Sequence, residues 1–439
     1  MEKYNSYKDS GVEWFGEIPS HWEKGKLYQY SEMSNGSTPS RVKPEYWENG
    51  TIPWMSSGEI NKKRIREIEG KITLEGFENS STKLLPVGTV MMGLNGQGKT
   101  KGTVGILEIE TTCNQSLCGM IFNDDINPVY GYYFLDSQYY NIRGLVGEGQ
   151  REGISVSFLS RYPLIVPPLS EQQQIVSFLD TKTSLIDSLI EKTQQKIELL
   201  KEKRTSLINE VVTKGLNPNV EMKDSGVEWI EEIPSSWSKT KMKHVVDIFG
   251  RIGYRGYTTE DIVDEGEGVI TISPSNIFDD KFSTDNSTYL SWEKYHESPE
   301  IQIFTNDIIL VKTGSTIGKT SIIPENVPEM TINPQLVVLK NIKVFPKYLY
   351  YQTVCKFIKE SFDIEQTGSS TPTISQEKVK DFPILEPPIN EQQQIVEFLD
   401  EQTQLIDKTI SIEKKRIELL KEYRQSLISE VVTGKRKVV

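Results

Sequence analysis

The chain has 439 residues, of which 36% are apolar and 26% charged, and its formal net charge is −12. This length predicts two or three domains with hydrophobic cores, and the negative charge argues against a protein whose whole surface binds nucleic acid. It still permits a basic face on one domain. No run of 18 apolar residues occurs, and the N-terminal stretch MEKYNSYKDS lacks the apolar segment of a secretory signal. We therefore expect no membrane span and a cytoplasmic location.

The few cysteines and histidines are scattered along the chain: Cys113, Cys118, Cys355, His21, His244 and His296. They have neither the spacing of a zinc site nor that of a disulfide framework. We therefore predict no bound metal, and we expect Cys113 and Cys118 to be small apolar residues of a buried strand.

In chain order, residues 1–22 form a short lead-in that contains KDSGVEWFGEIPSHW. This segment returns as KDSGVEWIEEIPSSW at residues 223–237, with 12 of 15 positions identical. Residues 215–237 combine that second lead-in with GLNPNVEM, whose Gly, Pro and Asn are typical of a linker. The repeat predicts a tandem duplication.

Each lead-in is followed by a globular segment, residues 23–166 in the first half and 238–386 in the second. The two segments differ in sequence but share an order of local signals. A strand, a Gly-rich turn and a strand (85–107; 304–323) precede CNQSL or INPQL. A tyrosine-rich helical stretch (130–140; 348–359) and a polar loop (147–153; 367–373) come next. Each segment therefore predicts a mixed α/β domain.

The first Gly-rich turn, GLNGQGKT at residues 93–100, fits the phosphate-loop pattern G-x-x-x-x-G-K-[ST]. That chemistry requires a helix after the loop, whereas KGTVGILEIE at residues 101–110 favours a strand. The corresponding turn GSTIGKT, at residues 314–320, is one residue too short. A P-loop nucleotidase remains as an alternative function.

Each half ends in a long predicted helix, residues 167–214 and 387–434, and 28 of 43 positions from Glu171 and Glu391 onward are identical. A Pro pair precedes each helix, Ser170 and Asn390 are the expected N-caps, and a Gly follows each end. About 44 residues without Pro or Gly predict a rod of roughly 66 Å. Its apolar seam, interrupted at Thr193 and Arg204, predicts a partner helix. A dimerising coiled coil is one alternative, but two similar copies in one chain favour intramolecular pairing. The seam residues are Leu179, Ile186, Ile190, Ile197, Leu200, Leu207, Leu399, Ile406, Ile410, Ile417, Leu420 and Leu427.

These features resemble the specificity subunit of a type I restriction-modification system over essentially the full length. The resemblance rests on the twin EQQQIV-FLD helix starts, the repeated ELLKE with SLI-EVVT, the GVEW-EIP-W lead-ins and the two dissimilar domains. It implies an α/β (α+β) fold, with two mixed α/β target recognition domains joined by two long helices that form an antiparallel intramolecular coiled coil. Residues 435–439 would be a basic tail.

The same resemblance implies a non-catalytic chain in which each domain reads one half of a bipartite site in double-stranded DNA. The helices would set the spacing and dock methyltransferase subunits, and restriction subunits would join through the complex. S-adenosylmethionine, ATP and Mg would be used by those partner subunits in adenine methylation and ATP-dependent cleavage. We expect no cofactor on this chain.

Candidate DNA contacts follow from side-chain chemistry, because cations bind phosphates and polar groups read base edges. In the first domain they are Lys62, Lys63, Arg64, Arg66, Asn95, Gln97, Lys99, Lys101, Gln150 and Arg151. In the second they are Arg251, Arg255, Lys312, Ser315, Thr316, Lys319, Ser369 and Ser370. Trp47 and Trp54 could stack on bases, although core packing is the more common use of Trp.

An alternative from another class is a coiled-coil adaptor whose domains bind proteins. The unequal similarity of the helices and the domains favours the specificity subunit, because an adaptor does not require two dissimilar domains on nearly unchanged helices.

Overall fold

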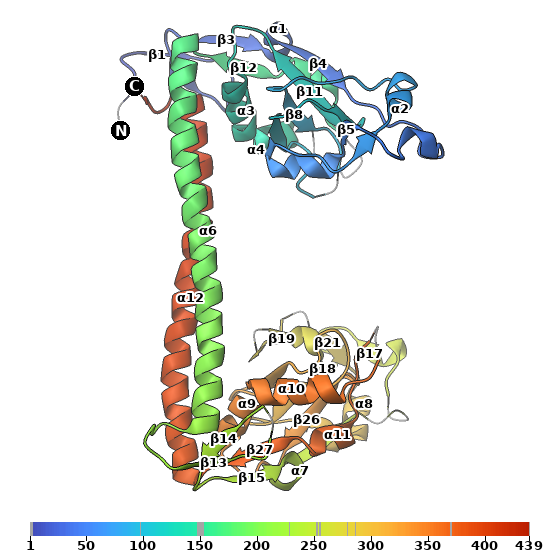
Figure 1. Cartoon of the computed structure of the whole chain (residues 1–439), viewed down its shortest axis with the longest axis vertical. Coiled ribbons are helices and arrows are strands. Elements are labelled where there is room, and N and C mark those ends of the chain that lie inside the picture. The colour runs from blue at the N-terminus through green and yellow to red at the C-terminus, as the bar shows by residue number, and fades with distance from the viewer. Residues whose placement is uncertain are drawn as a thin grey trace. The chain divides into compact units, whose positions relative to one another are not determined.

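The computed structural model describes residues 3–96, 98–146, 153–227, 229–251, 253, 256–278, 280–285, 287–368 and 371–438. These residues form two compact units. The first consists of Met1–Gln194 with Lys414–Val439, and the second is Gln195–Glu413. Each unit holds one globular domain and a stretch of each long helix (Figure 1). Within the described residues, no helix is long and apolar enough to cross a bilayer.

The first domain is built on a five-stranded mixed sheet of order β4-β11-β8-β9-β6. Its strands are β4 (Ser31–Asn35), β11 (Leu117–Phe122), β8 (Val90–Gly93), β9 (Val104–Leu107) and β6 (Arg64–Ile65). A smaller sheet of order β10-β5-β7 joins β10 (Thr112–Cys113), β5 (Ile52–Met55) and β7 (Lys71–Ile72). Cys113 and Cys118 are buried free thiols on two strands, β10 and β11, and burial raises the pKa of each to about 12.

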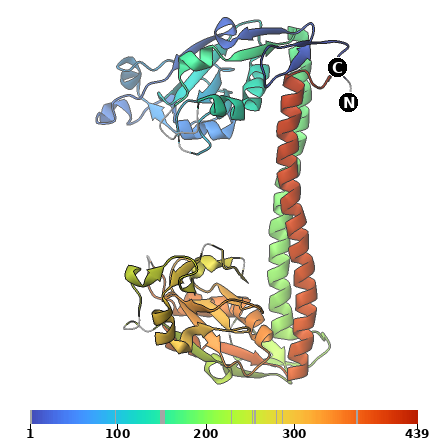
Figure 2. The same cartoon turned by 180° about the vertical axis from the view of Figure 1, so that it is seen from behind.

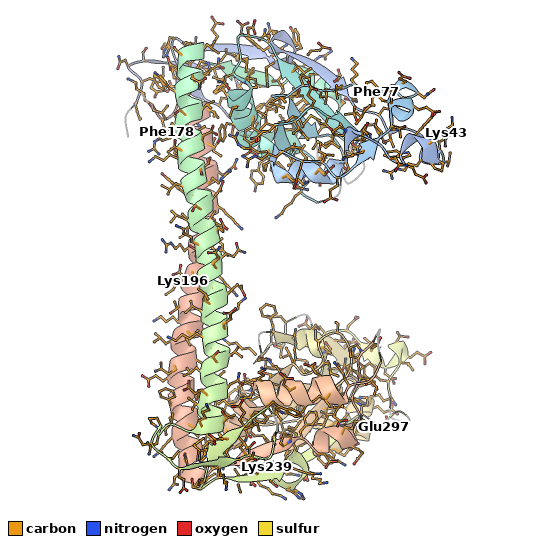
Figure 3. All side chains as sticks on the ribbon, viewed as in Figure 1. Lys43, Phe77, Phe178, Lys196, Lys239 and Glu297 are labelled. Atoms are coloured by element: carbon orange, nitrogen blue, oxygen red, sulfur yellow. The ribbon has the colours of Figure 1, made fainter. Side chains whose placement is uncertain are left out.

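Short helices complete this domain. They are α1 (Leu27–Tyr30), η1 (Pro44–Tyr46), η2 (Ser57–Lys62), α2 (Leu74–Glu78), α3 (Pro128–Ser137), α4 (Tyr139–Val146) and α5 (Val156–Ser160). Lys43 and Phe77 mark the end of the domain that is remote from the long helices (Figure 3). The tyrosines of α3 pack into the core with Val90, Met92 and Met120 of the sheet.

The second domain divides its strands between a four-stranded sheet, β16-β26-β23-β24, and a five-stranded one, β17-β21-β18-β25-β22. The first contains β16 (Asp247–Gly250), β26 (Leu336–Lys340), β23 (Ile308–Val311) and β24 (Thr320–Ile322). The second contains β17 (Ile262–Val263), β21 (Thr288–Leu290), β18 (Val269–Ile272), β25 (Met330–Ile332) and β22 (Gln302–Ile303). A hairpin pairs β19 (Ile277–Phe278) with β20 (Lys281–Phe282).

The second domain is helical where its sequence predicts a tyrosine-rich helical stretch. The helices α9 (Pro346–Val354) and α10 (Lys356–Glu365) contain nearly all of those residues. The others are α7 (Met242–Val245), η4 (Thr259–Asp261), η5 (Pro274–Asn276), α8 (Trp292–Glu297), η6 (Pro299–Ile301) and α11 (Gln376–Lys380).

Each domain begins and ends on one antiparallel strand pair. In the first domain β3 (Glu23–Lys26) pairs with β12 (Pro163–Val166), so Glu23 faces Val166. In the second, β15 (Ser238–Lys241) pairs with β27 (Pro383–Glu386), and Ser238 faces Glu386. The lead-ins form hairpins, β1 (Tyr7–Asp9) with β2 (Glu17–Pro19) and β13 (Met222–Asp224) with β14 (Glu232–Pro234). The two ends of each domain therefore lie side by side.

The long helices are α6 (Leu169–Lys214) and α12 (Ile389–Val432). The expected N-caps Ser170 and Asn390 are wrong, because both residues lie inside the first turn. That turn already begins at the second proline of each pair: the carbonyl of Pro168 accepts from the amides of Glu171 (2.9 Å) and Gln172 (3.0 Å). Gly215 and Gly434, with φ of 75° and 74°, follow the helix ends as predicted.

The two helices run antiparallel in each unit, where they lie side by side (Figures 1 and 2). In the first unit Asp187 of α6 accepts from Arg424 of α12 (2.9 Å), and in the second Arg204 of α6 lies 3.2 Å from Asp407 of α12. We call these two ion pairs the clamps. Because each pairs an early residue of one helix with a late residue of the other, they fix the antiparallel register.

All twelve expected seam residues are buried or half-buried. One clamp explains why Arg204 stands in the apolar row: its guanidinium pairs with Asp407 of the other helix. The gap at Thr193 is buried, and its hydroxyl donates to the carbonyl of Leu189 (2.7 Å). The matching position in α12 is Glu413, a buried carboxylate that accepts from Lys196 (2.5 Å), which Figure 3 labels. The seam thus combines apolar packing with polar pairs that specify register.

Candidate nucleic-acid interface

Several loops of the first domain converge at one end of its sheet. The amide of Leu94, after β8, donates to the carbonyl of Ser116 (2.8 Å), and that of Ser37, after β4, donates to the carbonyl of Cys113 (2.9 Å). The amide of Ile154 donates in turn to the carbonyl of Leu94 (2.9 Å). We call this convergence of residues 36–38, 94–96, 98–102, 113–117 and 153–155 the first loop end.

The first loop end presents polar side chains on a backbone held by hydrogen bonds. Thr38 donates to Gln115 (2.6 Å), while Asn95 and Lys99 are exposed. The Gly-rich turn is supported from α4, because Arg143 donates to the carbonyls of Gly98 (3.0 Å) and Lys101 (2.8 Å). Short polar side chains on such a support can hydrogen-bond to a ligand with little loss of conformational entropy.

The second domain builds the equivalent second loop end from residues 273–278, 312–319, 333–335, 367–368 and 371–374. The amides of Lys312 and Gly314 donate to the carbonyls of Gln335 and Pro372, each at 2.8 Å. The hydroxyls of Thr313 and Thr373 lie 2.8 Å apart. The same succession of turn, strand and loop therefore produces the same kind of surface in both domains.

A groove of about 440 Å³ opens on the second loop end. Its lining is rich in hydroxyl groups and includes one side-chain amide, one cation and one exposed aromatic ring: Ser273, Ser275, Phe278, Thr313, Ser315, Thr316, Lys319 and Gln335. Amide and hydroxyl groups are the side chains that read base edges, and Lys neutralises phosphate. The groove thus has the chemistry of a nucleic-acid contact.

Some of the predicted DNA contacts lie on the loop ends, and others are buried. Asn95 and Lys99 lie on the first loop end, and Lys312, Ser315, Thr316 and Lys319 on the second. Lys101 and Arg251 are buried instead of lying on the surface. Arg251 donates to the carbonyl of Ile332 and to Thr331, both at 3.1 Å, and burial lowers its pKa. Gln97, Gln150, Arg151, Arg255, Ser369 and Ser370 lie outside the described residues.

Four basic residues of the first domain were expected to contact phosphates, and all four pair with carboxylates of their own unit. They are Lys62, Lys63, Arg64 and Arg66. Lys62 lies 3.8 Å from Glu59, and Lys63 lies 2.6 Å from Asp136. Arg66 lies 2.6 Å from Glu108, and Arg64 bridges Glu108 and Asp180 of α6. With side chains of α3, α6 and α12 they line a cleft of about 710 Å³. A DNA phosphate would have to compete with these pairs.

Trp54 follows the packing interpretation, whereas Trp47 is only half-buried. Their rings meet edge to face at 5.0 Å, and Trp54 is buried and donates to the carbonyl of Ser37 (2.9 Å). The guanidinium of Arg41 covers both rings.

Sequence reasoning missed several residues of the loop ends: Thr38, Gln115, Ser273, Ser275, Phe278 and Gln335. A signal existed for the two glutamines, because CNQSL and INPQL occupy the same place in the order of motifs. The others lie in segments for which the two halves gave no common motif.

A family model described as the type I restriction modification DNA specificity domain matches the chain twice, over residues 19–199 and 234–422. The chain belongs to the type I DNA specificity family. Its role is that of a DNA sequence-specificity subunit, and each match covers one domain and the first part of the following helix.

Curated relatives agree with this membership. The MjaVIII and MjaIX specificity subunits of Methanocaldococcus jannaschii are 24% and 23% identical over 432 and 434 residues, covering 96% of this chain and 94% and 95% of theirs. The EcoR124I/EcoR124II specificity subunit of Escherichia coli is 32% identical over 199 residues. That match spans 44% of this chain and 46% of the Escherichia coli subunit.

Solved structures share the fold. A chain from a study of complex assembly and conformational transition of the type I restriction-modification system superposes with a TM-score of 0.71 at 15% identity. The match covers 94% of this chain and 98% of that one. The HsdS subunit from Thermoanaerobacter tengcongensis gives a TM-score of 0.54 at 15% identity, with 95% and 98% covered. Both span the two domains and the two helices.

The phosphate-loop pattern of this specificity subunit lies in a different context from that of a nucleotidase. The turn at residues 93–100 is followed by β9, which pairs with β8 as predicted, whereas a phosphate loop opens a helix. Lys99 is an exposed side chain of the first loop end.

We therefore predict that the purified chain binds no ATP and that Lys99→Ala leaves its ATP hydrolysis at the baseline of a protein-free control. Isothermal titration with Mg-ATP and a phosphate-release assay measure both. Turnover that the substitution abolishes would contradict this prediction and restore the nucleotidase alternative.

Proposed function

We propose that each loop end reads one half of a bipartite site in double-stranded DNA, and that the two antiparallel helices set the distance between the half-sites. The observation that carries this proposal is the contrast within the duplication. The helices and lead-ins keep 28 of 43 and 12 of 15 positions identical. They make equivalent contacts, such as Trp22 to Glu171 (3.0 Å) and Trp237 to Glu391 (3.1 Å). The loop ends carry different side chains on the same framework.

The difference between the loop ends predicts two different half-sites. The first offers an amide beside a hydroxyl, Gln115 with Thr38, together with Asn95 and Lys99. The second offers a hydroxyl-lined groove with Gln335 and Lys319. Because base recognition depends on the placement of donors and acceptors, these two arrangements select different bases.

The outer surfaces of the helices support docking of methyltransferase subunits. On α12, Leu405, Ile412 and Leu419 recur seven residues apart and are 60%, 58% and 53% exposed, and on α6, Leu185 and Leu199 are 56% and 64% exposed. Apolar residues at heptad spacing that no other part of the described chain covers are typical of a helix that packs against a further helix. In the proposed assembly those helices belong to methyltransferase subunits.

The chemistry belongs to the partners in this proposal. S-adenosylmethionine would serve adenine methylation in the methyltransferase subunits, and ATP and Mg would serve restriction subunits that join through the complex. The present chain would supply only the recognition of the DNA sequence.

Exchange of one domain tests the proposal. Residues 23–166 begin and end on the paired strands β3 and β12, so the matching domain of a relative can replace them without displacing the helices. In a strain that carries the methyltransferase and restriction subunits, we expect the methylated motif to change in one half only, as read by methylome sequencing. A simultaneous change of both halves, or no methylated motif with the unmodified chain, would contradict the proposal.

Single side chains at the loop ends provide a finer test. Gln335→Ala should relax base discrimination in one half-site by about tenfold, since a well-placed amide contact to a base is worth roughly 1–3 kcal/mol. Gln115→Ala should relax the other half-site instead. Competition binding of the assembled methyltransferase to duplexes with single base changes measures both. Each variant is the control for the other, because each should affect a different half-site. Equal loss of discrimination in both half-sites with Gln335→Ala would indicate general misfolding.

A matched insertion tests the helices as a ruler. The clamps place Lys192 of α6 opposite Leu419 of α12, because each step along one helix is matched by a step back along the other. Four residues inserted after Lys192 and four after Glu418 therefore keep both clamps, and each insertion adds about 6 Å and little more than one turn.

We expect this doubly lengthened chain to direct methylation of the same two half-sites with a spacer longer by about two base pairs. Insertions of two residues rotate the seam by about 200° and serve as the control that should fail to fold. An unchanged spacer in the methylated motif of the four-residue variant would show that the helices do not set the distance.

A further inference from the structure

We infer that two equivalent side-chain latches, Asp180 with Tyr133 and Arg64, and Asp400 with Tyr351 and Lys347, fix the angle at which each domain projects from its helix. These residues would thereby be positioning residues that hold the loop ends in register with the two half-sites. The inference rests on the proposed function, because it concerns how the reading surfaces are aimed.

The first latch lies on α6. The hydroxyl of Tyr133, from α3, donates to Asp180 Oδ1 (2.7 Å) and lies 3.1 Å from the hydroxyl of Thr183. The guanidinium of Arg64, from β6, donates to the same Asp180 oxygen (2.5 Å). Burial raises the pKa of Tyr133 to about 12, so its hydroxyl keeps the proton that it donates. Two elements of the domain therefore hold one carboxylate of the helix.

The second latch, on α12, combines the same kinds of group. The hydroxyl of Tyr351, from α9, donates to Asp400 Oδ1 (2.7 Å) and lies 3.3 Å from the hydroxyl of Thr403. Lys347, also from α9, donates to Asp400 Oδ2 (2.6 Å). The helix partners of the two latches are the same residues of the repeated motif, 220 positions apart.

The cations show that the latch is more than an inherited packing contact. The domain sequences have diverged, and the first latch takes its cation from a strand while the second takes it from a helix. Both nevertheless place a tyrosine hydroxyl and a positive charge on one aspartate. Two different solutions to one geometric requirement indicate that the fixed pose itself matters.

A second attachment point makes the latch an angular constraint. Gln172, in the first turn of α6, accepts from the amide of Asn127 (2.8 Å), and Gln392 of α12 accepts from the amide of Phe345 (2.9 Å). The latch aspartate follows eight residues later in each helix, about 12 Å along the axis. Together with the apolar contacts, two polar contacts separated along one helix therefore constrain the direction in which the domain projects.

The exposure of the latch carboxylates separates positioning from stability. Asp180 and Asp400 are 42% and 37% exposed, and ion pairs with that exposure contribute little to the free energy of unfolding. The domains are held to the helices mainly by apolar cores, in which Tyr130 packs with Val431 and Val432 of α12. Loss of a latch should therefore loosen the pose of a domain without detaching it.

The test uses the full chain assembled with its methyltransferase subunits and a series of duplexes whose spacers differ by one base pair from the cognate length. We expect Asp180→Ala, Asp400→Ala and Tyr133→Phe to lower discrimination between cognate and altered spacers about tenfold, as for loss of a charge-assisted hydrogen bond. Preference for bases within each half-site should remain. Glu198→Ala is the matched control, because Glu198 is exposed and pairs with Lys201 of the same helix at 3.0 Å.

Unchanged spacer discrimination in both aspartate variants would overturn the latch while leaving the proposed function intact. Failure of the unmodified complex to prefer any bipartite duplex would instead refute the proposed function. Tyr133→Phe removes one hydroxyl and keeps the ring, so it decides the question if Asp180→Ala does not fold.

Discussion

The antiparallel pairing of α6 and α12 is the constraint on which the other features depend. An apolar seam alone tolerates slippage by a heptad, because each register buries a similar row of side chains. The clamps remove this freedom, since Asp187 meets Arg424 and Arg204 meets Asp407 in a single register. The buried Glu413 with Lys196 adds a third polar pair to the seam. Within each unit, a fixed register gives the residues of one helix defined neighbours on the other, as the proposed role in spacing requires.

The fixed helices make divergence of the domains possible. Each domain starts and finishes on one strand pair, and its loop end is built from segments between those strands. Substitutions in the loops therefore leave the attachment to the helices unchanged. Part of the attachment comes from motif residues such as Gln172 and Gln392, which accept from backbone amides and so place no demand on the domain side chains at those two points. One helix motif can carry domains of different sequence for this reason.

Much of this architecture was predictable, and the exceptions have physical causes. Periodicity and repetition predicted the helices and their pairing, and alternating β-branched residues correctly predicted a strand after the phosphate-loop pattern. The N-caps were misplaced because a proline carbonyl, which has no side-chain signal, accepts the first helical bonds. Residue type alone predicted a surface role for Arg251, whose burial depends on tertiary contacts with Thr331 and Ile332. The groove around Gln335 joins segments far apart in sequence, so no local pattern reveals it.

The net charge of −12 agrees with a chain that recognises DNA through short-range contacts and not through long-range electrostatic attraction. Lys63, Arg64 and Arg66 are neutralised by carboxylates of their own unit, and Lys347 is held in a latch. The cations of the described loop ends, such as Lys99 and Lys319, are few beside the hydroxyl and amide groups around them. Long-range attraction to DNA scales with the number of phosphates neutralised, whereas discrimination depends on the fit of donors and acceptors. In the proposed assembly, a chain with this distribution would contribute mainly discrimination, and the attraction that brings DNA to it would come from the partner subunits.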